Sequence, residues 1–343
     1  PYDDLHCSYD KVARCQELDI DLLIDDAPGN LQGDTRFMAV TETDETVQVT
    51  FDDLADEQTD GPGNLAFHAA NLTGNPLVIE PCLTVAGVGA APETTRLAPV
   101  TLPPVSGEGE GLSPLPFALS FPALRAGECT VTLTLGSDRH YRAETTFQVS
   151  VLHETHYGWT LPGSTEEAAL WWASSGWKVS RTRPAPQEQA PAMRIQAARN
   201  EREAAQFILC PARPLQELKI SAGPLQGNNG AVLPPEAIEI LRVGYVPVTQ
   251  PTDLLGVIAP WPDPLPPLDG PLDLPAKENQ PFWVRFHASP DTPAGVYRGT
   301  IALAAKGYQA EVPLEVEVFD FSLPFRSTCV SAFGFSPALA FQY

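Results

Sequence analysis

The chain has 343 residues, of which 43 % are apolar and 19 % charged, so it can form about two domains with proper cores, and global disorder is excluded. Its 43 acidic and 21 basic residues give a formal charge of −22, and a surface this acidic excludes nucleic-acid and peripheral-membrane partners because it repels phosphates. No apolar run approaches the roughly 20 residues that span a bilayer, so membrane insertion is not expected.

Proline accounts for 36 residues, near twice the usual share. Because proline interrupts helices and is tolerated in turns and edge strands, this abundance predicts a β-rich protein with rigid connections. The chain begins at Pro1 without a Met or a signal sequence, and it stops at Tyr343 without a tail. We therefore expect a processed or trimmed product of a longer parent protein.

Residues 1–60 are strongly acidic, with 17 acidic residues against three basic ones. The clusters Asp19–Asp26 and Asp52–Asp60 hold carboxylates of the kind that calcium prefers. Neither matches the EF-hand template, in which oxygens alternate around a central glycine. We interpret this segment as a solvated acidic face and predict no metal and no cofactor.

Alternating apolar and polar residues predict strands over residues 47–51, 130–135 and 147–151. The side chains expected to face inward are Val47, Val49, Phe51, Val131, Leu133, Leu135, Phe147, Val149 and Val151. One buried and one solvated face is typical of an antiparallel sheet over a core, and Gly/Pro clusters separate the runs. The pattern predicts an immunoglobulin-like β-sandwich over residues 1–152. Asn71 also fits the N-glycosylation pattern.

The six cysteines lack the CxxC spacing of zinc or dithiol redox sites. Cys7 and Cys15 could close a short loop, and Cys82 and Cys129 could bridge the first sandwich. The alternative is that most of them are small buried apolar residues. Disulfides would imply an extracellular or periplasmic location, which we expect for this protein.

Residues 153–163 are a predicted linker, and residues 164–326 a second antiparallel sandwich. Strands are expected over residues 238–248, 281–288, 296–303 and 311–318, with a turn at 291–295. In the last strand, Val312, Leu314, Val316 and Val318 should face inward, and Glu315 and Glu317 outward. Because Pro313 has no N–H, this strand should lie at an edge or leave that position unpaired.

The densest run of prolines extends from Pro260 to Pro275. It is too long and too stiff for a simple hairpin, and such ordered loops are usually functional or packed on a neighbouring domain. Tryptophan can stack on sugar faces, although core packing is its commoner role in a sandwich. The candidates for a sugar platform are Trp171, Trp172, Trp177, Trp261 and Trp283. Only Trp261 is predicted to be exposed, because prolines surround it, and it is the single predicted carbohydrate contact.

No catalytic residue is predicted. Glycosidases hold two carboxyls about 5–10 Å apart across a sugar, whereas adjacent residues of a strand point to opposite faces. This argues against the pairs Asp44–Glu45, Asp56–Glu57 and Glu166–Glu167. His153 and His156 lie in the linker without a third metal ligand. Glu201 and Arg202 are expected to form an internal ion pair or a turn.

Three segments resemble one family. They are residues 197–207, 291–301 and 312–324, which are similar to the N-terminal β-sandwich of proteins related to glycoside hydrolase family 123. Residues 170–172, 177–179 and 261–265 are more weakly similar to other positions of the same family. The resemblance covers about residues 165–335, and the first 150 residues resemble only a generic sandwich.

The resemblance implies a role beside a catalytic domain. In that family the sandwich precedes a (β/α)-barrel that acts on 2-acetamido sugars by a substrate-assisted mechanism with a paired Asp and Glu. Residues 327–343 would be the start of this barrel, so no catalytic residue of the family can be placed on the chain. The chain alone is not expected to be an enzyme, although its parent could be a glycosidase. It would be the non-catalytic N-terminal portion of a secreted glycoside-hydrolase-like protein, supporting the barrel and able to shape one rim of its sugar site.

Two other functions fit the sequence. The first is an extracellular structural or adhesive module, such as a surface-layer or fibre subunit, since exposed edge strands permit self-assembly by strand addition. The other is a free-standing carbohydrate-binding module.

Overall fold

The computed structural model describes residues 38–51, 63–105, 112–122, 124–136, 141–228, 230–252 and 256–326. These residues form strands almost throughout, and the helical elements among them are two short 3₁₀ turns, Val151–His153 and Pro235–Ala237. The predicted all-β class is confirmed. No helix in this part of the chain is long and apolar enough to cross a membrane.

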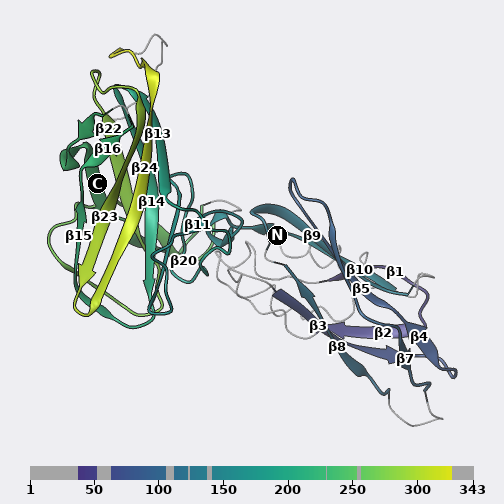
Figure 1. Ribbon diagram of the computed structural model, residues 1–343. Coiled ribbons are helices and arrows are strands. Elements are labelled where there is room, and N and C mark those ends of the chain that lie inside the picture. The colour runs from purple at the N-terminus through teal and green to yellow at the C-terminus, as the bar shows by residue number, and fades with distance from the viewer. Residues whose placement is uncertain are drawn as a thin grey trace, which may run out of the picture.

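Two sheets enclose the first core, in residues 38–149 (Figure 1). One sheet has the order β1-β10-β9-β5-β6 and the other the order β2-β3-β8, while β4 and β7 pair with each other. The bounds are β1 Ala39–Thr43, β2 Val47–Phe51, β3 Gly63–Asn71, β4 Leu77–Ile79, β5 Pro81–Gly87, β6 Glu93–Arg96, β7 Val100–Leu102, β8 Leu115–Phe121, β9 Gly127–Leu135 and β10 Tyr141–Val149.

Period-two alternation places the core residues of this first sandwich. Val131, Leu133 and Leu135 of β9 are buried as predicted, and the threonines between them face outward. Val47 and Val49 are also buried, while Phe51 is only partly so. The immunoglobulin-like arrangement of the strands stays a prediction.

The predicted strand over residues 147–151 ends early. β10 stops at Val149, and Val151 is 37 % exposed at the start of a 3₁₀ turn. The cause is Ser150, whose hydroxyl accepts a hydrogen bond from the Leu152 N–H and so begins the turn. The side chain of Phe147 lies outside the described set.

Cys82 and Cys129 do not form the bridge that was one of the two alternatives for them. They lie on neighbouring strands of one sheet, but Cys129 is opposite Gly87 and Cys82 is opposite Thr134. Cys129 faces the core, whereas Cys82 points to the other face because its neighbour Leu83 is the buried residue. Cys7, Cys15 and Cys329 lie outside the described residues, as do the acidic clusters at 19–26 and 52–60 and the predicted barrel start at 327–343.

The second core lies between two larger sheets in residues 159–322. One has the order β11-β12-β14-β22-β18, and the other β13-β24-β23-β15-β21, with β16 and β17 attached and β19-β20 as a separate ribbon. The bounds are β11 Trp159–Thr160, β12 Ala168–Ser174, β13 Met193–Arg199, β14 Glu201–Pro211, β15 Leu215–Ala222, β16 Leu225–Gly227, β17 Val232–Leu233, β18 Ile238–Arg242, β19 Tyr245–Val248, β20 Ala259–Pro262, β21 Leu272–Leu274, β22 Gln280–Ala288, β23 Gly295–Ala305 and β24 Tyr308–Ser322.

The second sandwich is not wholly antiparallel, because β13 pairs with β24 in parallel. Of the two arrangements expected for the strand at 311–318, the edge position is wrong, since β24 has β23 on one side and β13 on the other, whereas the unpaired position at Pro313 holds on the β13 side. Pro313 pairs with Thr300 of β23, and the β13 ladder begins one residue later at Leu314. The proline therefore lies where β24 has a partner on one side only, as its missing N–H favours. The four inward residues of this strand are buried as predicted.

Three other boundaries differ from expectation. The strand predicted over 238–248 breaks at Val243 and Gly244 into β18 and β19. The proline-rich run is partly a ribbon, since β20 pairs with β19. The predicted linker at 153–163 overlaps β11, which pairs with β12.

Candidate functional site

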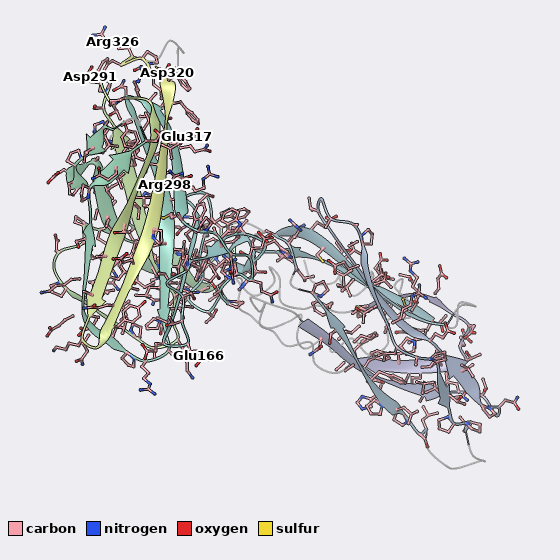
Figure 2. All side chains as sticks on the ribbon, in the orientation of Figure 1. Glu166, Asp291, Arg298, Glu317, Asp320 and Arg326 are labelled. Carbon is pink, nitrogen blue, oxygen red and sulfur yellow. The ribbon has the colours of Figure 1, made fainter. Side chains whose placement is uncertain are left out.

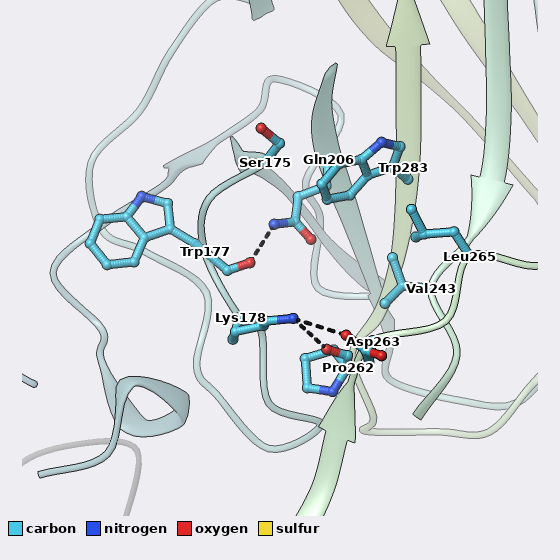
Figure 3. Close-up of a pocket in the computed structure, with 9 residues that line it drawn as sticks. All are labelled: Ser175, Trp177, Lys178, Gln206, Val243, Pro262, Asp263, Leu265 and Trp283. Atoms are coloured by element: carbon cyan, nitrogen blue, oxygen red, sulfur yellow. Dashed lines mark hydrogen bonds and ion pairs between the residues drawn. The ribbon is translucent and has the colours of Figure 1, made fainter. Parts of the chain in front are cut away.

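A small pocket opens on the outer face of the sheet that contains β14 and β22 (Figure 3). Its lining residues are Ser175, Trp177, Lys178, Gln206, Val243, Pro262, Asp263, Leu265 and Trp283. Gln206 and Trp283 are direct cross-strand partners. Their neighbours Phe207 and Phe282 are fully buried in the core, so alternation directs Gln206 and Trp283 out of the sheet to form the floor.

The proline-rich segment forms one wall because it lies close against Gly244. A β-carbon on Gly244 would lie 2.8 Å from a side-chain carbon of Pro264, so no other residue fits without a shift. The Gly244 N–H donates to the Pro264 carbonyl at 2.7 Å. The break between β18 and β19 therefore creates the space into which residues 262–265 fold.

Two polar side chains hold the opposite wall. Gln206 is 2 % exposed, and its side-chain amide donates to the carbonyls of Ser174 at 3.1 Å and Trp177 at 2.8 Å. The Lys178 ammonium reaches across the pocket to the Pro262 carbonyl at 3.1 Å and to the Asp263 carboxylate at 3.4 Å. The side chains of Gln206 and Lys178 thus form hydrogen bonds within the chain, and these bonds hold the pocket walls in place.

A partly buried phenol, that of Tyr245, supports the same wall. The Tyr245 hydroxyl donates to the Val179 carbonyl at 2.9 Å, next to Lys178. Burial raises the pKa of Tyr245, and the Arg181 guanidinium that stacks on its ring only partly opposes this. The phenol therefore stays neutral and keeps donating.

The chemistry available to this pocket is limited. Its volume is about 100 Å³, whereas pockets that enclose small molecules hold roughly 300–1,000 Å³. Asp263 is the one carboxyl among the lining residues, so the pair that a glycosidase needs is absent from the lining. The pocket could contact the edge of a polar ligand, with Trp283 as its apolar surface.

Trp261, the predicted carbohydrate contact, does not line this pocket. It lies on β20 opposite Val246, is partly buried, and donates its indole N–H to the Val257 carbonyl at 2.8 Å. The prediction that Trp261 alone is exposed is wrong, because Trp177 is 39 % exposed and pairing with β19 partly covers Trp261. A contact between Trp261 and a sugar stays a prediction.

The five candidate tryptophans do not form one platform. Trp171 and Trp172 are neighbours on β12, where they point to opposite faces, and both are buried. Trp177 stacks on Tyr157 with ring centroids 4.3 Å apart and planes at 3°. Figure 3 shows its indole directed away from the pocket. Alternation along β12 is the sequence signal that separates the first two.

The remaining candidates for catalysis or metal binding are the carboxylate pairs and the histidines of the predicted linker. The described residues contain no group of three His, Cys, Asp or Glu that could hold a metal. Glu166 and Glu167 are exposed, and the pair at 56–57 lies outside the described residues. His156 contacts Glu154, with its Nδ1 2.7 Å from a carboxylate oxygen.

The turn expected for Glu201 and Arg202 lies one residue earlier, at Asn200, and both residues belong to the start of β14. Asn200 has a φ of 60°, which asparagine tolerates, and at this residue the chain passes from β13 in one sheet to β14 in the other. The Glu201 carboxylate accepts a hydrogen bond from the Ala198 N–H at 2.6 Å across this turn. Glu201 therefore braces the turn that joins the two sheets of the second sandwich.

Part of the second sandwich is similar to a known family of domains. Residues 172–305 match the glycoside hydrolase 123 N-terminal domain, which confirms the predicted resemblance over that range. A solved structure of a family 123 glycoside hydrolase from Clostridium perfringens, studied for glycolipid glycan hydrolysis, is 15 % identical and has a TM-score of 0.33, with 38 % of this chain and 23 % of that chain covered.

A second solved structure, Escherichia coli alpha-2-macroglobulin activated by porcine elastase, is 8 % identical, with a TM-score of 0.27 and coverage of 79 % of this chain and 22 % of that chain. The chain thus spans less than a quarter of either solved chain. A comparison with curated proteins finds no match.

Proposed function

We propose that this chain is the non-catalytic N-terminal portion of a secreted glycoside-hydrolase-like protein, in which two sandwich domains support a following (β/α)-barrel. The match of residues 172–305 to the glycoside hydrolase 123 N-terminal domain carries this proposal. The proposed domains are residues 1–152 and 164–326, joined by residues 153–163. The two large hydrophobic cores share no residue, which supports this division.

The exposed end of β24 is the surface on which we propose that the barrel packs. The pairing of β24 with β23 ends at Val318, but the strand continues to Ser322. Beyond the β23 ladder, where only β13 still pairs with β24, Phe319 and Phe321 stack with ring centroids 5.9 Å apart, and Phe321 is 55 % exposed. Phe325, just after the strand, is 84 % exposed. Clustered exposed apolar side chains are typical of contact surfaces.

Charged residues border this apolar end. Figure 2 places Asp291, Asp320 and Arg326 at the same end of the second sandwich. An apolar centre with a charged rim is the usual arrangement of a protein–protein contact, since the rim stays hydrated while the centre loses its water. This arrangement supports a barrel as the neighbour.

Hydrolysis assays test the non-catalytic part of the proposal. The purified chain should release no aryl leaving group from an aryl 2-acetamido-glycoside, whereas a parent chain that includes the barrel should release it. A heat-denatured sample of the parent chain serves as the control. Sugar hydrolysis by residues 1–343 alone would contradict the proposal.

Carbohydrate contact and secretion are further parts of the proposal. Trp261→Ala should weaken any binding on a glycan array, with Trp159→Ala as a matched change of another partly buried tryptophan outside the pocket lining; equal binding by wild type and Trp261→Ala counts against the contact. Cell fractionation should find the parent outside the cytoplasm. Cys82 and Cys129 lend no support to that location because they are not bridged to each other.

Light scattering separates support from self-assembly. A supporting segment should remain a monomer at high concentration. Concentration-dependent growth in mass would instead favour the structural or adhesive function, in which edge strands add to one another.

A further inference from the structure

Glu154 fastens the connection between the two sandwiches to the first of them. Its side chain is 7 % exposed. One carboxylate oxygen accepts a hydrogen bond from the Ala126 N–H at 2.9 Å, and Ala126 lies between β8 and β9 of the first sandwich. The other oxygen accepts from the His156 N–H at 2.7 Å and lies 2.7 Å from the His156 ring Nδ1. A single buried carboxylate thus holds the first sandwich to the connecting segment, residues 154–158.

Arg183 holds the same segment from the second sandwich. Its side chain is buried, and the guanidinium lies 3.7 Å from the ring centre of Tyr157 and 4.5 Å from that of Trp171. It donates to the Thr155 carbonyl at 2.9 Å and also to the Tyr157 carbonyl. Cation–π contacts of this kind are strongest when water is excluded.

Gly158 lets the segment pass close to Trp171. Its φ is 90°, a conformation that L side chains rarely adopt. A β-carbon there would also lie 3.0 Å from the Trp172 carbonyl oxygen and 3.1 Å from the Trp171 ring. The path of the chain into the second sandwich is therefore closely constrained.

From these contacts we infer that Glu154 and Arg183 form a joint lock, which fastens residues 154–158 to both sandwiches. The lock makes the connection rigid and so fixes the orientation of one sandwich relative to the other. Domains in one chain usually move relative to one another unless specific contacts prevent it. Here each sandwich contributes its own contact to one five-residue segment, and an ionised carboxylate makes stronger hydrogen bonds than a neutral acceptor. The lock depends only on contacts within the chain and is independent of the proposed function.

The protonation state of Glu154 agrees with the lock. Burial alone would raise the pKa of this carboxyl, but the N–H donors of Ala126 and His156 and the His156 ring outweigh burial and lower the pKa below its usual value. The carboxylate is therefore ionised at neutral pH and accepts from both sides.

Amide hydrogen exchange on the intact chain tests the joint lock. In the wild type, the amides of Ala126 and His156 should exchange slowly although neither lies in a strand. Glu154→Ala should accelerate both by about tenfold or more, as loss of a charge-assisted hydrogen bond predicts. Glu154→Gln, which keeps one carbonyl oxygen, should have a smaller effect. Glu166→Ala removes an exposed glutamate and should change neither amide.

Small-angle X-ray scattering provides an independent readout. The wild-type curve should fit the single arrangement of the two sandwiches in the structure, and the Glu154→Ala curve should require a spread of arrangements. Unprotected amides at Ala126 and His156 in the wild type, or a wild-type curve that needs several arrangements, would overturn the inference without any variant. So would unchanged exchange in a folded Glu154→Ala protein.

Discussion

Replacement of Gly299 by alanine should destabilise the second sandwich and leave the first one unchanged. Gly299 lies on β23 at the point where β16 begins to pair with it. An added β-carbon would lie 2.7 Å from the Pro224 carbonyl oxygen and 2.6 Å from a methyl carbon of Leu225. The carbonyl cannot yield easily, since the neighbouring Gly223 N–H is bonded to the Thr300 carbonyl at 3.0 Å.

The size of the effect follows from this overlap. Forcing an extra methyl group into a packed interior costs about 1–3 kcal/mol in the free energy of unfolding. For a domain of this size, each kcal/mol lowers Tm by about 2–4 °C. The transition of the second sandwich should therefore fall by about 2–12 °C.

Differential scanning calorimetry can measure this change if the two sandwiches give separate transitions. Leu133 lies in the fully buried core of the first sandwich, so Leu133→Ala should lower the free energy of unfolding of that sandwich by about 2–5 kcal/mol. The transition that moves to lower temperature is then assigned to the first sandwich. Gly176→Ala is the matched control, because nothing lies within 4 Å of its added carbon. It should be neutral or slightly stabilising through the unfolded chain. Equal Tm values for Gly299→Ala and Gly176→Ala would refute the reasoning.

Three more outcomes are expected. The pKa of Glu154 is lower in the folded chain than the value of about 4.3 for an unfolded chain. Protection of the Ala126 amide from exchange should therefore be complete above about pH 4.3 and be lost as the pH falls through the folded pKa. A protection factor that stays constant down to about pH 2 contradicts this. Arg183→Met should lower the free energy of unfolding of the second sandwich by about 2–4 kcal/mol, since two backbone carbonyls lose a charged donor, and an unchanged denaturation midpoint counts against it. Asn71 is 3 % exposed and its amide bonds the Asn75 carbonyl at 2.7 Å, so expression in a glycosylating host should leave it unmodified, and a glycopeptide in the mass spectrum would disprove that.

The strands and their buried faces could be predicted because alternation is a local property. A strand turns successive side chains to opposite faces, so the apolar residues of β9 and β24 identified the core sides without any knowledge of their partners. The same rule, applied around Leu83, would have excluded the bridge between Cys82 and Cys129. Residues 291–301 also resembled a family hairpin, and the close approach at Gly299 is a physical reason for a glycine in it.

The exposure of Trp261 could not be read from its proline-rich surroundings. Proline favours loops, but β20 contains two prolines and still pairs with β19, because the proline positions of an isolated two-stranded ribbon can face away from the partner strand. The position of the pocket likewise depended on Gly244, whose lack of a side chain matters only once Pro264 lies against it.

The amino-acid sequence by itself determined the all-β class, the buried faces of most strands and the resemblance of the second sandwich to a known domain, since these follow from local alternation, proline content and short motifs. Only the tertiary structure decided which strands are neighbours, that β13 runs parallel to β24, and that Glu154 meets Ala126 from 28 residues away. Such contacts depend on how sheets pack and in which register, and no local pattern encodes the distance between segments that the chain brings together only on folding.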